Sequence, residues 1–219
     1  MTFSNLSVEH SSTVDRVADE LRRALFDGEV ETGTALREVA LAEAMGVARS
    51  TIREALAVLV AEGLAVREPN RGVHVTDPDA EAIEDVCRAR LVLETAGVRR
   101  WADASEEARD AVRRSLEVFA SSAATASPAE FAAHHLAFHA SLVGLTESPR
   151  LVAQAESLYT EIRLALAHVD RLRRNQAELV ESHRLLLRLL EQGRIEETVV
   201  ELERHIEDGA RSMLGRLGS

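Results

Sequence analysis

Apolar residues recur at intervals of three and four through the first quarter of the chain, which is the spacing of amphipathic helices. The first apolar stripe comprises Val14, Val17, Ala18, Leu21 and Leu25, and it ends before Gly28. A short second helix is predicted over residues 38–45, ending at Gly46. A third helix is predicted after Val47.

The pattern then changes from helical spacing to short alternating runs. Residues 64–68 and 73–76 alternate apolar and polar positions, and the turn residues Pro69, Asn70, Arg71 and Gly72 separate the two runs. A period of two on both sides of such a turn is typical of a β-hairpin. Three helices followed by a hairpin is the element order of a winged helix-turn-helix.

From Pro78 onward the pattern predicts helices only. The expected spans are 79–102, 105–119, 128–145, 149–169, about 175–191 and 195–214. The connections are short, so neighbouring helices should pack antiparallel as a bundle. We therefore expect a mostly α protein with a winged helix-turn-helix domain over residues 8–77 and an all-α helical domain over residues 78–219.

The start of the third predicted helix carries side chains suited to DNA. In a helix-turn-helix the N-terminal residues of this helix enter the major groove, and here they include Arg49, Ser50, Thr51 and Arg53. Arg49 and Arg53 share one face, and an arginine can pair with guanine through two hydrogen bonds. Arg71, at the hairpin tip, could reach a phosphate or the minor groove. The alternative for these arginines is the solvated face of an amphipathic helix.

Composition changes this picture in two ways. The formal net charge of −11 argues against DNA binding, but all 26 basic residues are arginines and several of them lie in the expected DNA-facing segment. The single cysteine, the absence of a long apolar run and the lack of a secretory leader favour the cytoplasm, with no membrane contact.

The segment LREVALAEAMGVARSTIREALAVLVAEGLAVREPNRGVHV resembles the DNA-binding domain of the GntR family of bacterial repressors. The resemblance implies DNA contacts from the reading helix and the wing, through Arg49, Ser50, Thr51, Arg53, Asn70, Arg71 and Gly72. Ala48 departs from the family, which usually has Ser or Thr at this position, and we expect one capping or phosphate-contacting hydroxyl to be missing.

Four histidines have a suggestive placement in the helical half. His135 and His139 lie four residues apart, so two imidazoles on one helix face could bind one metal ion. His183 and His205 lie on the last two predicted helices, and facing helices of a bundle can bring such side chains together. Spacing alone leaves open that these histidines are surface or core residues without an ion.

The segments RLVLETAG, HLAFHASLVGLTESPRL, ESHRLLLRLLEQG and ELERHIEDGA resemble the FCD effector domain of the FadR subfamily, in its six-helix VanR-like variant. In metal-binding members an Asp and three His hold the ion. His139, His183 and His205 match the three histidines, and His135 stands at the Asp position. Four neutral ligands leave the charge of the ion uncompensated, and imidazoles favour Zn²⁺ or Ni²⁺ over Mg²⁺ or Ca²⁺.

The resemblance also places Arg90 at an inward-facing position, where it could bind the carboxylate of an effector. The alternative partner of Arg90 is Glu94, one helical turn away. We expect a transcriptional regulator without enzymatic activity. It should be a repressor that binds a palindromic operator as a homodimer and responds to a small organic acid bound at the metal. The alternatives are a helical-bundle metalloenzyme using the histidines and a DNA binder without a sensor.

Overall fold

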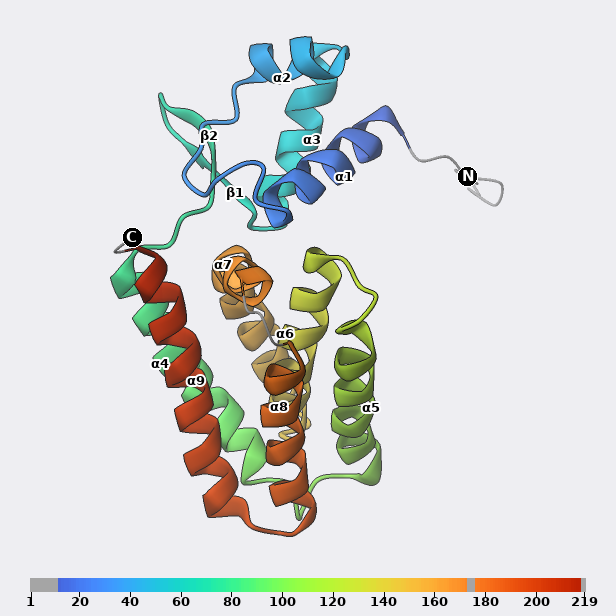
Figure 1. Cartoon of the computed structure of the whole chain (residues 1–219), viewed down its shortest axis with the longest axis vertical. Helices are drawn as coiled ribbons and strands as arrows, with labels where there is room; N and C mark the ends of the chain where they lie inside the picture. The colour runs from blue at the N-terminus through green and yellow to red at the C-terminus, as the bar shows by residue number, and fades with distance from the viewer. Residues whose placement is uncertain (1–11, 173–175, 218–219) are drawn as a thin grey trace, which may run out of the picture.

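The computed structural model describes residues 12–172 and 176–217, and Figure 1 shows a small N-terminal unit on one end of a larger helical bundle. The N-terminal unit contains α1 (Thr13–Phe26), α2 (Glu38–Met45), α3 (Arg49–Ala61), β1 (Ala65–Glu68) and β2 (Gly72–Val75). The strands pair antiparallel, with Ala65 opposite Val75, so the predicted hairpin is confirmed. Its first strand begins one residue later than predicted, and its second strand begins and ends one residue earlier. This is the winged helix-turn-helix that the element order predicted.

Local chemistry fixes the turns of this unit. The side chain of Ser12 accepts a hydrogen bond from the Asp15 amide and caps α1. Gly46 adopts a left-handed conformation (φ 64°) that ends α2 and starts the tight turn to α3. The N-cap of α3 is Ala48, which makes no side-chain capping bond, as its lack of a hydroxyl predicts.

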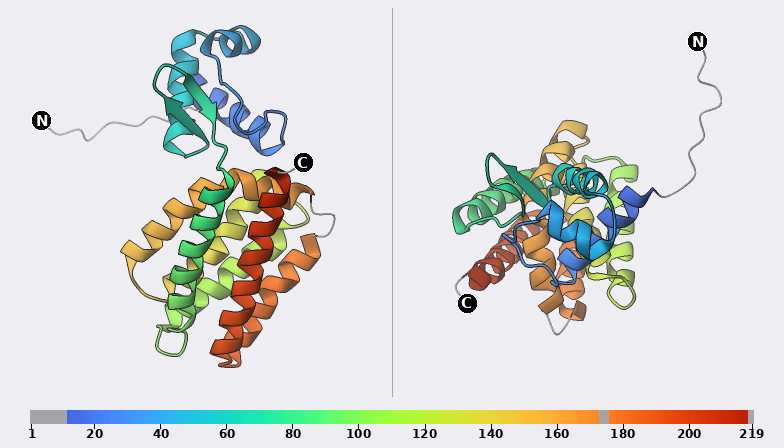
Figure 2. Two further views of the ribbon diagram at one scale, coloured as in Figure 1. Left: turned by 90° about the vertical axis from the view of Figure 1, so that its left-hand side faces the viewer. Right: turned by 90° about the horizontal axis from the view of Figure 1, so that it is seen from above.

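The bundle contains six helices within the described residues, in agreement with the six-helix expectation (Figure 2). They are α4 (Ala80–Val98), α5 (Glu106–Ser122), α6 (Pro128–Gly144), α7 (Pro149–Leu172), α8 (Gln176–Glu191) and α9 (Ile195–Leu217). The helix predicted over 105–119 ends too early, because α5 continues to Ser122, which is buried and donates a hydrogen bond to the Phe119 carbonyl oxygen. The predicted start of α8 near Asn175 lies outside the described residues.

The bundle core lies between α6 and its neighbours. Helix α6 packs on α5 and α7, and α4 packs on α9 and α6. The expected domain boundaries, 8–77 and 78–219, stay predictions, and residues 8–11 and 218–219 lie outside the described residues. None of the helices in the described part of the chain has the length and hydropathy that crossing a bilayer requires.

The N-terminal unit and the bundle share a packed seam. Ala132 of α6 and Leu164 and Ala167 of α7 belong to the same buried cluster as the core of the N-terminal unit. The guanidinium of Arg163 lies 5.2 Å from the centre of the Phe26 ring at the end of α1. Because Ala132, Leu164 and Ala167 are buried in one apolar cluster with the N-terminal core, the seam holds the two parts in a defined orientation.

Candidate nucleic-acid interface and metal centre

The expected DNA-reading residues gather at the end of the molecule farthest from the bundle, where α2 and the start of α3 lie (Figure 1). The side chains of Arg49 and Arg53 are 61% and 58% exposed. Ser50 is exposed and Thr51 is half-buried on the same helical turn. The structure therefore leaves the predicted reading face open to solvent.

The wing completes this face. Asn70 (φ 64°) and Gly72 (φ 90°) form the left-handed positions of the hairpin turn, and both residues and Arg71 are exposed. Between the wing, α2 and α3 lies a groove of about 690 Å³. Its ionisable lining residues are Arg37, Glu38, Arg49, Arg67, Arg71 and His74. Sequence reasoning did not single out Arg37, Glu38 or His74, because the groove exists only where the wing packs beside α2 and α3.

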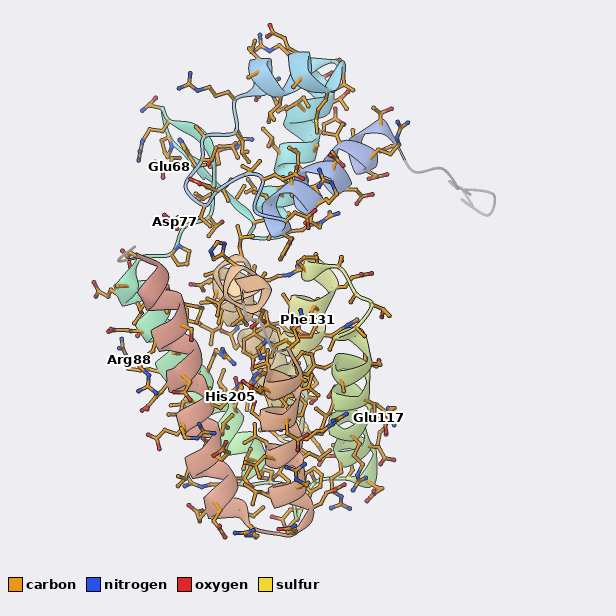
Figure 3. The ribbon with its side chains drawn as sticks, in the orientation of Figure 1. Glu68, Asp77, Arg88, Glu117, Phe131 and His205 are labelled. Carbon is orange, nitrogen blue, oxygen red and sulfur yellow. The ribbon has the colours of Figure 1, made fainter. Side chains whose placement is uncertain are left out.

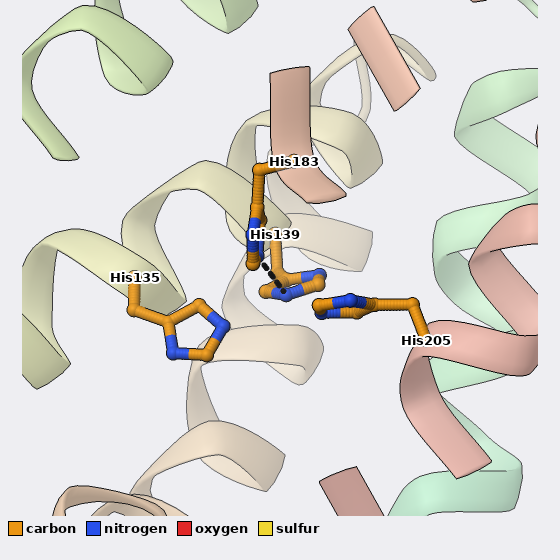
Figure 4. Close-up of side chains that lie close together, drawn as sticks. All are labelled: His135, His139, His183 and His205. Carbon is orange, nitrogen blue, oxygen red and sulfur yellow. Dashed lines mark hydrogen bonds between the residues drawn. The ribbon is translucent and has the colours of Figure 1, made fainter. Parts of the chain in front are cut away.

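The four predicted metal-ligating histidines converge inside the bundle (Figure 4). His135 and His139 come from α6, His183 from α8 and His205 from α9, and one ring nitrogen of each lies within 4.8 Å of the others. His135, His139 and His183 are buried, and His205 is half-buried. Figure 3 shows His205 at mid-height of the bundle, apart from the N-terminal unit.

Hydrogen bonds on the outer side of three of these rings fix their tautomers. The Nδ1 of His139 lies 2.7 Å from Glu94 Oε2, that of His135 lies 2.8 Å from Asp170 Oδ2, and that of His183 lies 2.7 Å from the Leu179 carbonyl oxygen. A carbonyl or an ionised carboxylate only accepts, so each Nδ1 donates its proton. In a ring that carries one proton, that proton is therefore on Nδ1, and Nε2 presents a lone pair to the cluster.

The titration of the buried groups agrees with neutral rings. Burial lowers the pKa of His139 to about 4 and that of His183 well below its usual range. Burial favours the neutral acid of Glu94, but His139 and Arg90 outweigh it and bring the pKa of Glu94 down to about 2. Near pH 7 His139 and His183 are thus neutral imidazoles, and an ionised carboxylate, that of Glu94, lies behind His139.

The spacing of the inner nitrogens fits a cation. His139 Nε2 and His183 Nε2 lie 3.3 Å apart, close to the separation of about 3.3 Å between two nitrogens bound tetrahedrally to zinc. Two facing lone pairs repel each other unless a positive charge lies between them. His135 Nε2 is buried and has no hydrogen-bond partner among the described residues, which also suits a ligand atom.

Glu94 and Asp170 correct one expectation. Two carboxylates lie directly behind His139 and His135, so the charge of a bound ion would be partly compensated. Sequence spacing missed Asp170, which lies 35 residues from His135, and placed Glu94 only beside Arg90. Such pairs between helices leave no periodic signal in the sequence.

Arg90 lies beside this centre with an internal partner. Its Nε donates to Glu94 Oε1 at 3.0 Å, the Tyr159 hydroxyl donates to the same oxygen at 3.0 Å, and Arg90 is only 4% exposed. The salt bridge with Glu94 that sequence analysis held as the alternative is therefore present. A contact between Arg90 and an effector stays a prediction.

Comparison with known proteins matches both parts of the chain to family models. Residues 13–75 match the model for bacterial regulatory proteins of the gntR family, and residues 85–208 match the FCD domain. A crystal structure described as a GntR transcriptional regulator from Rhodococcus sp. RHA1 is 29% identical, with a TM-score of 0.70 over 92% of this chain and 97% of that chain.

Two relatives with named roles are also similar in sequence. The gluconate operon transcriptional repressor of Bacillus licheniformis is 34% identical over 62% of this chain and 56% of its own length. A D-xylose utilization operon repressor of Paenarthrobacter nicotinovorans is 26% identical over 88% of this chain and 85% of its own length. Among the curated relatives the matched share of their length ranges from 35% to 85%, and the operons in these names belong to those proteins. With both family models matched in order, the chain belongs to the GntR family of transcriptional regulators and carries an FCD domain.

Proposed function

We propose that this protein is a ligand-responsive repressor that binds a palindromic operator as a homodimer and holds a divalent transition metal in its bundle. It would act in the cytoplasm, where the DNA is. The observation that carries the DNA-binding part is the open face formed by Arg49 and Arg53 of α3 and Arg71 of the wing. Two copies related by a two-fold axis would present two such faces to the two half-sites.

The metal is proposed for His135, His139, His183 and His205. Three converging lone pairs, an orphaned buried nitrogen and acceptors behind three of the rings are the features of a histidine site prepared for a metal ion. Nitrogen donors favour Zn²⁺ or Ni²⁺ over Mg²⁺ and Ca²⁺. When bound, such an ion supplies a positive centre that can accept an anionic ligand.

A small carboxylate is the effector class that this centre suits best. A carboxylate gains an ionic bond at a metal whose protein ligands are all neutral, and Glu94 and Asp170 compensate only part of the charge. Arg90 retains N–H groups beyond the one that it donates to Glu94, and these could hold the far end of the effector.

Helices α6 and α7 offer a route from this centre to the DNA-binding unit. Tyr159 of α7 donates to Glu94, whose second oxygen accepts from His139, and one turn later Arg163 contacts Phe26 of α1. A displacement of the cluster therefore reaches the seam through two hydrogen bonds and one helical turn. Effector and operator affinities can be coupled only if the protein has two conformations that differ in their affinity for the effector.

The metalloenzyme alternative receives no support from the family, whose members and named relatives are transcriptional regulators. The DNA binder without a sensor is equally unsupported, because an FCD domain fills most of the remaining chain.

Two experiments test the proposal. An operator selected from random duplexes should bind with a stoichiometry of two chains per site, and Arg53→Ala should lower the affinity by about 5- to 150-fold and relax base preference. Elemental analysis of tag-free protein after metal supplementation should give about one metal ion per chain, and His139→Ala should abolish it. If Arg53→Ala protein binds the operator with the affinity of the parent, the docking model is refuted. If the parent protein contains no metal after supplementation, the proposed metal site is refuted.

A further inference from the structure

An acidic side chain lies inside the basic groove of the reading face. Glu38, the first residue of α2, accepts from Arg53 Nε at 3.1 Å and from Arg53 Nη2 at 2.9 Å. Its Oε2 also lies 3.8 Å from Arg49 Nη2. The hydrogen bonds from Arg53 lower the pKa of Glu38, with smaller contributions from the charges of Arg49 and Arg67, so the carboxylate is ionised.

A negative charge at this place opposes the approach of DNA. Glu38 lines the same groove as Arg49, Arg67 and Arg71, and a phosphate backbone entering that groove would be repelled by the carboxylate. The charge stabilises α2 modestly, since an acid in the first turn of a helix interacts favourably with the helix dipole. This stabilisation requires a negative charge at residue 38 but not the contact with Arg53.

The geometry of the pair indicates a second use. Glu38 engages the Nε and Nη2 edge of the Arg53 guanidinium with both of its oxygens. A contact through two parallel bonds fixes the plane of the guanidinium as well as its position. Nη1 makes no hydrogen bond among the described residues, and the Nη1–Nη2 end of a guanidinium can donate to both O6 and N7 of guanine.

We propose that Glu38 is a positioning residue of DNA readout, which holds the Arg53 guanidinium in the orientation that reads a base. The carboxylate itself does not touch DNA in this arrangement. The inference rests on the proposed function, because a base preference must exist before a residue can set it. Ordering Arg53 in advance reduces the entropy that a flexible side chain loses on binding, which raises discrimination even though the charge lowers general affinity.

The matched comparison is between Glu38 and Glu43. Glu43 is an exposed acid on the same helix, with no ion pair among the described residues. Both Glu38→Gln and Glu43→Gln remove one negative charge from the DNA-binding unit, but only Glu38→Gln removes the bidentate acceptor. Glu38→Asp keeps the charge for the helix dipole and shortens the side chain by one methylene group.

Affinity would be measured for the selected operator and for a shuffled duplex of equal length, at several salt concentrations. Glu43→Gln should raise both affinities alike and leave their ratio unchanged. Glu38→Gln should raise affinity for the shuffled duplex and lower the operator-to-shuffled ratio by at least about fivefold. Glu38→Asp should also lower the ratio, although the helix retains its charge.

A background without Arg53 makes the test specific. In Arg53→Ala protein, Glu38→Gln should leave the ratio unchanged, because the two residues act as one unit. Ratios within twofold of the parent for both Glu38 variants would overturn the inference while leaving the proposed function intact. A parent protein that does not discriminate between the two duplexes would overturn the proposed function, and the inference with it.

Discussion

Gly97 offers a strong test of how the bundle positions the candidate metal centre. At this residue α4 crosses α6 so closely that a Cβ atom on Gly97 would lie 1.9 Å from the Leu142 carbonyl oxygen and 2.8 Å from its carbonyl carbon. Both are backbone atoms within helix α6, so no side-chain rotation can relieve the overlap. Gly97→Ala must therefore move one helix away from the other.

The size of the effect follows from the distances. A carbon and a carbonyl oxygen make an acceptable contact at about 3.3 Å, so the helices must separate by roughly 1.4 Å at this point. Protein interiors resist such shifts, and we expect a loss of about 3 kcal/mol or more in the free energy of unfolding. The bond between Glu94 and His139 joins the same two helices one turn away and should be disturbed as well.

Urea denaturation followed by helical circular dichroism measures the first effect, and metal titration of the folded variant measures the second. Gly144→Ala on α6 is the matched control, because nothing lies within 4 Å of its added Cβ. It should be neutral or more stable by up to about 1 kcal/mol, since alanine is the better helix former. A Gly97→Ala protein within about 0.5 kcal/mol of the parent would refute the close approach.

Three further changes have distinct expected outcomes. Asp170→Asn should weaken metal binding by about 10- to 100-fold, measured by competition with a chromophoric chelator, because it removes the charge behind His135; unchanged affinity would contradict that role. Leu164→Ala should cost about 2–5 kcal/mol in urea denaturation by leaving a cavity in the seam, and a loss below about 1 kcal/mol would show that the seam is loosely packed. Ser127→Ala should cost about 1 kcal/mol, since Ser127 caps α6 in a capping box, with the exposed Ser121→Ala as control; equal stability of the two variants would contradict the cap.

The elements that were predicted correctly are those whose limits depend on a pattern within a few neighbouring residues. Apolar spacing located the helices, and the change to a period of two around Asn70 and Gly72 located the wing. The end of α5 was mispredicted because Ser121 and Ser122 are as common in loops as in helices. Packing of Phe119 into the core decides that the helix continues, and this contact comes from α6 and α8 rather than from neighbouring residues.

The candidate sites were predictable to a smaller extent. The histidine spacing and the family resemblance identified the ring nitrogens, but not the acceptors behind them, because Glu94 and Asp170 reach the cluster from other helices. Glu38 was missed for the same reason, since its partner Arg53 lies 15 residues away on α3. Side-chain pairs between helices depend on crossing angles, and a single sequence does not specify these angles.

The seam indicates which helices would connect the histidine cluster to the DNA-binding unit. Helix α4 follows the wing directly in the chain, but the connection of residues 76–79 fixes mainly the distance between the two parts. Orientation is fixed where surfaces pack, and there the contacts come from Ala132 of α6 and from Leu164 and Ala167 of α7. Because α6 carries His135 and His139 while α7 carries Tyr159 and Asp170, the helices that hold the reading face in place are those that contact the histidine cluster. A rearrangement that moves His135 or His139 would therefore act on the two helices on which the orientation of the DNA-binding unit depends.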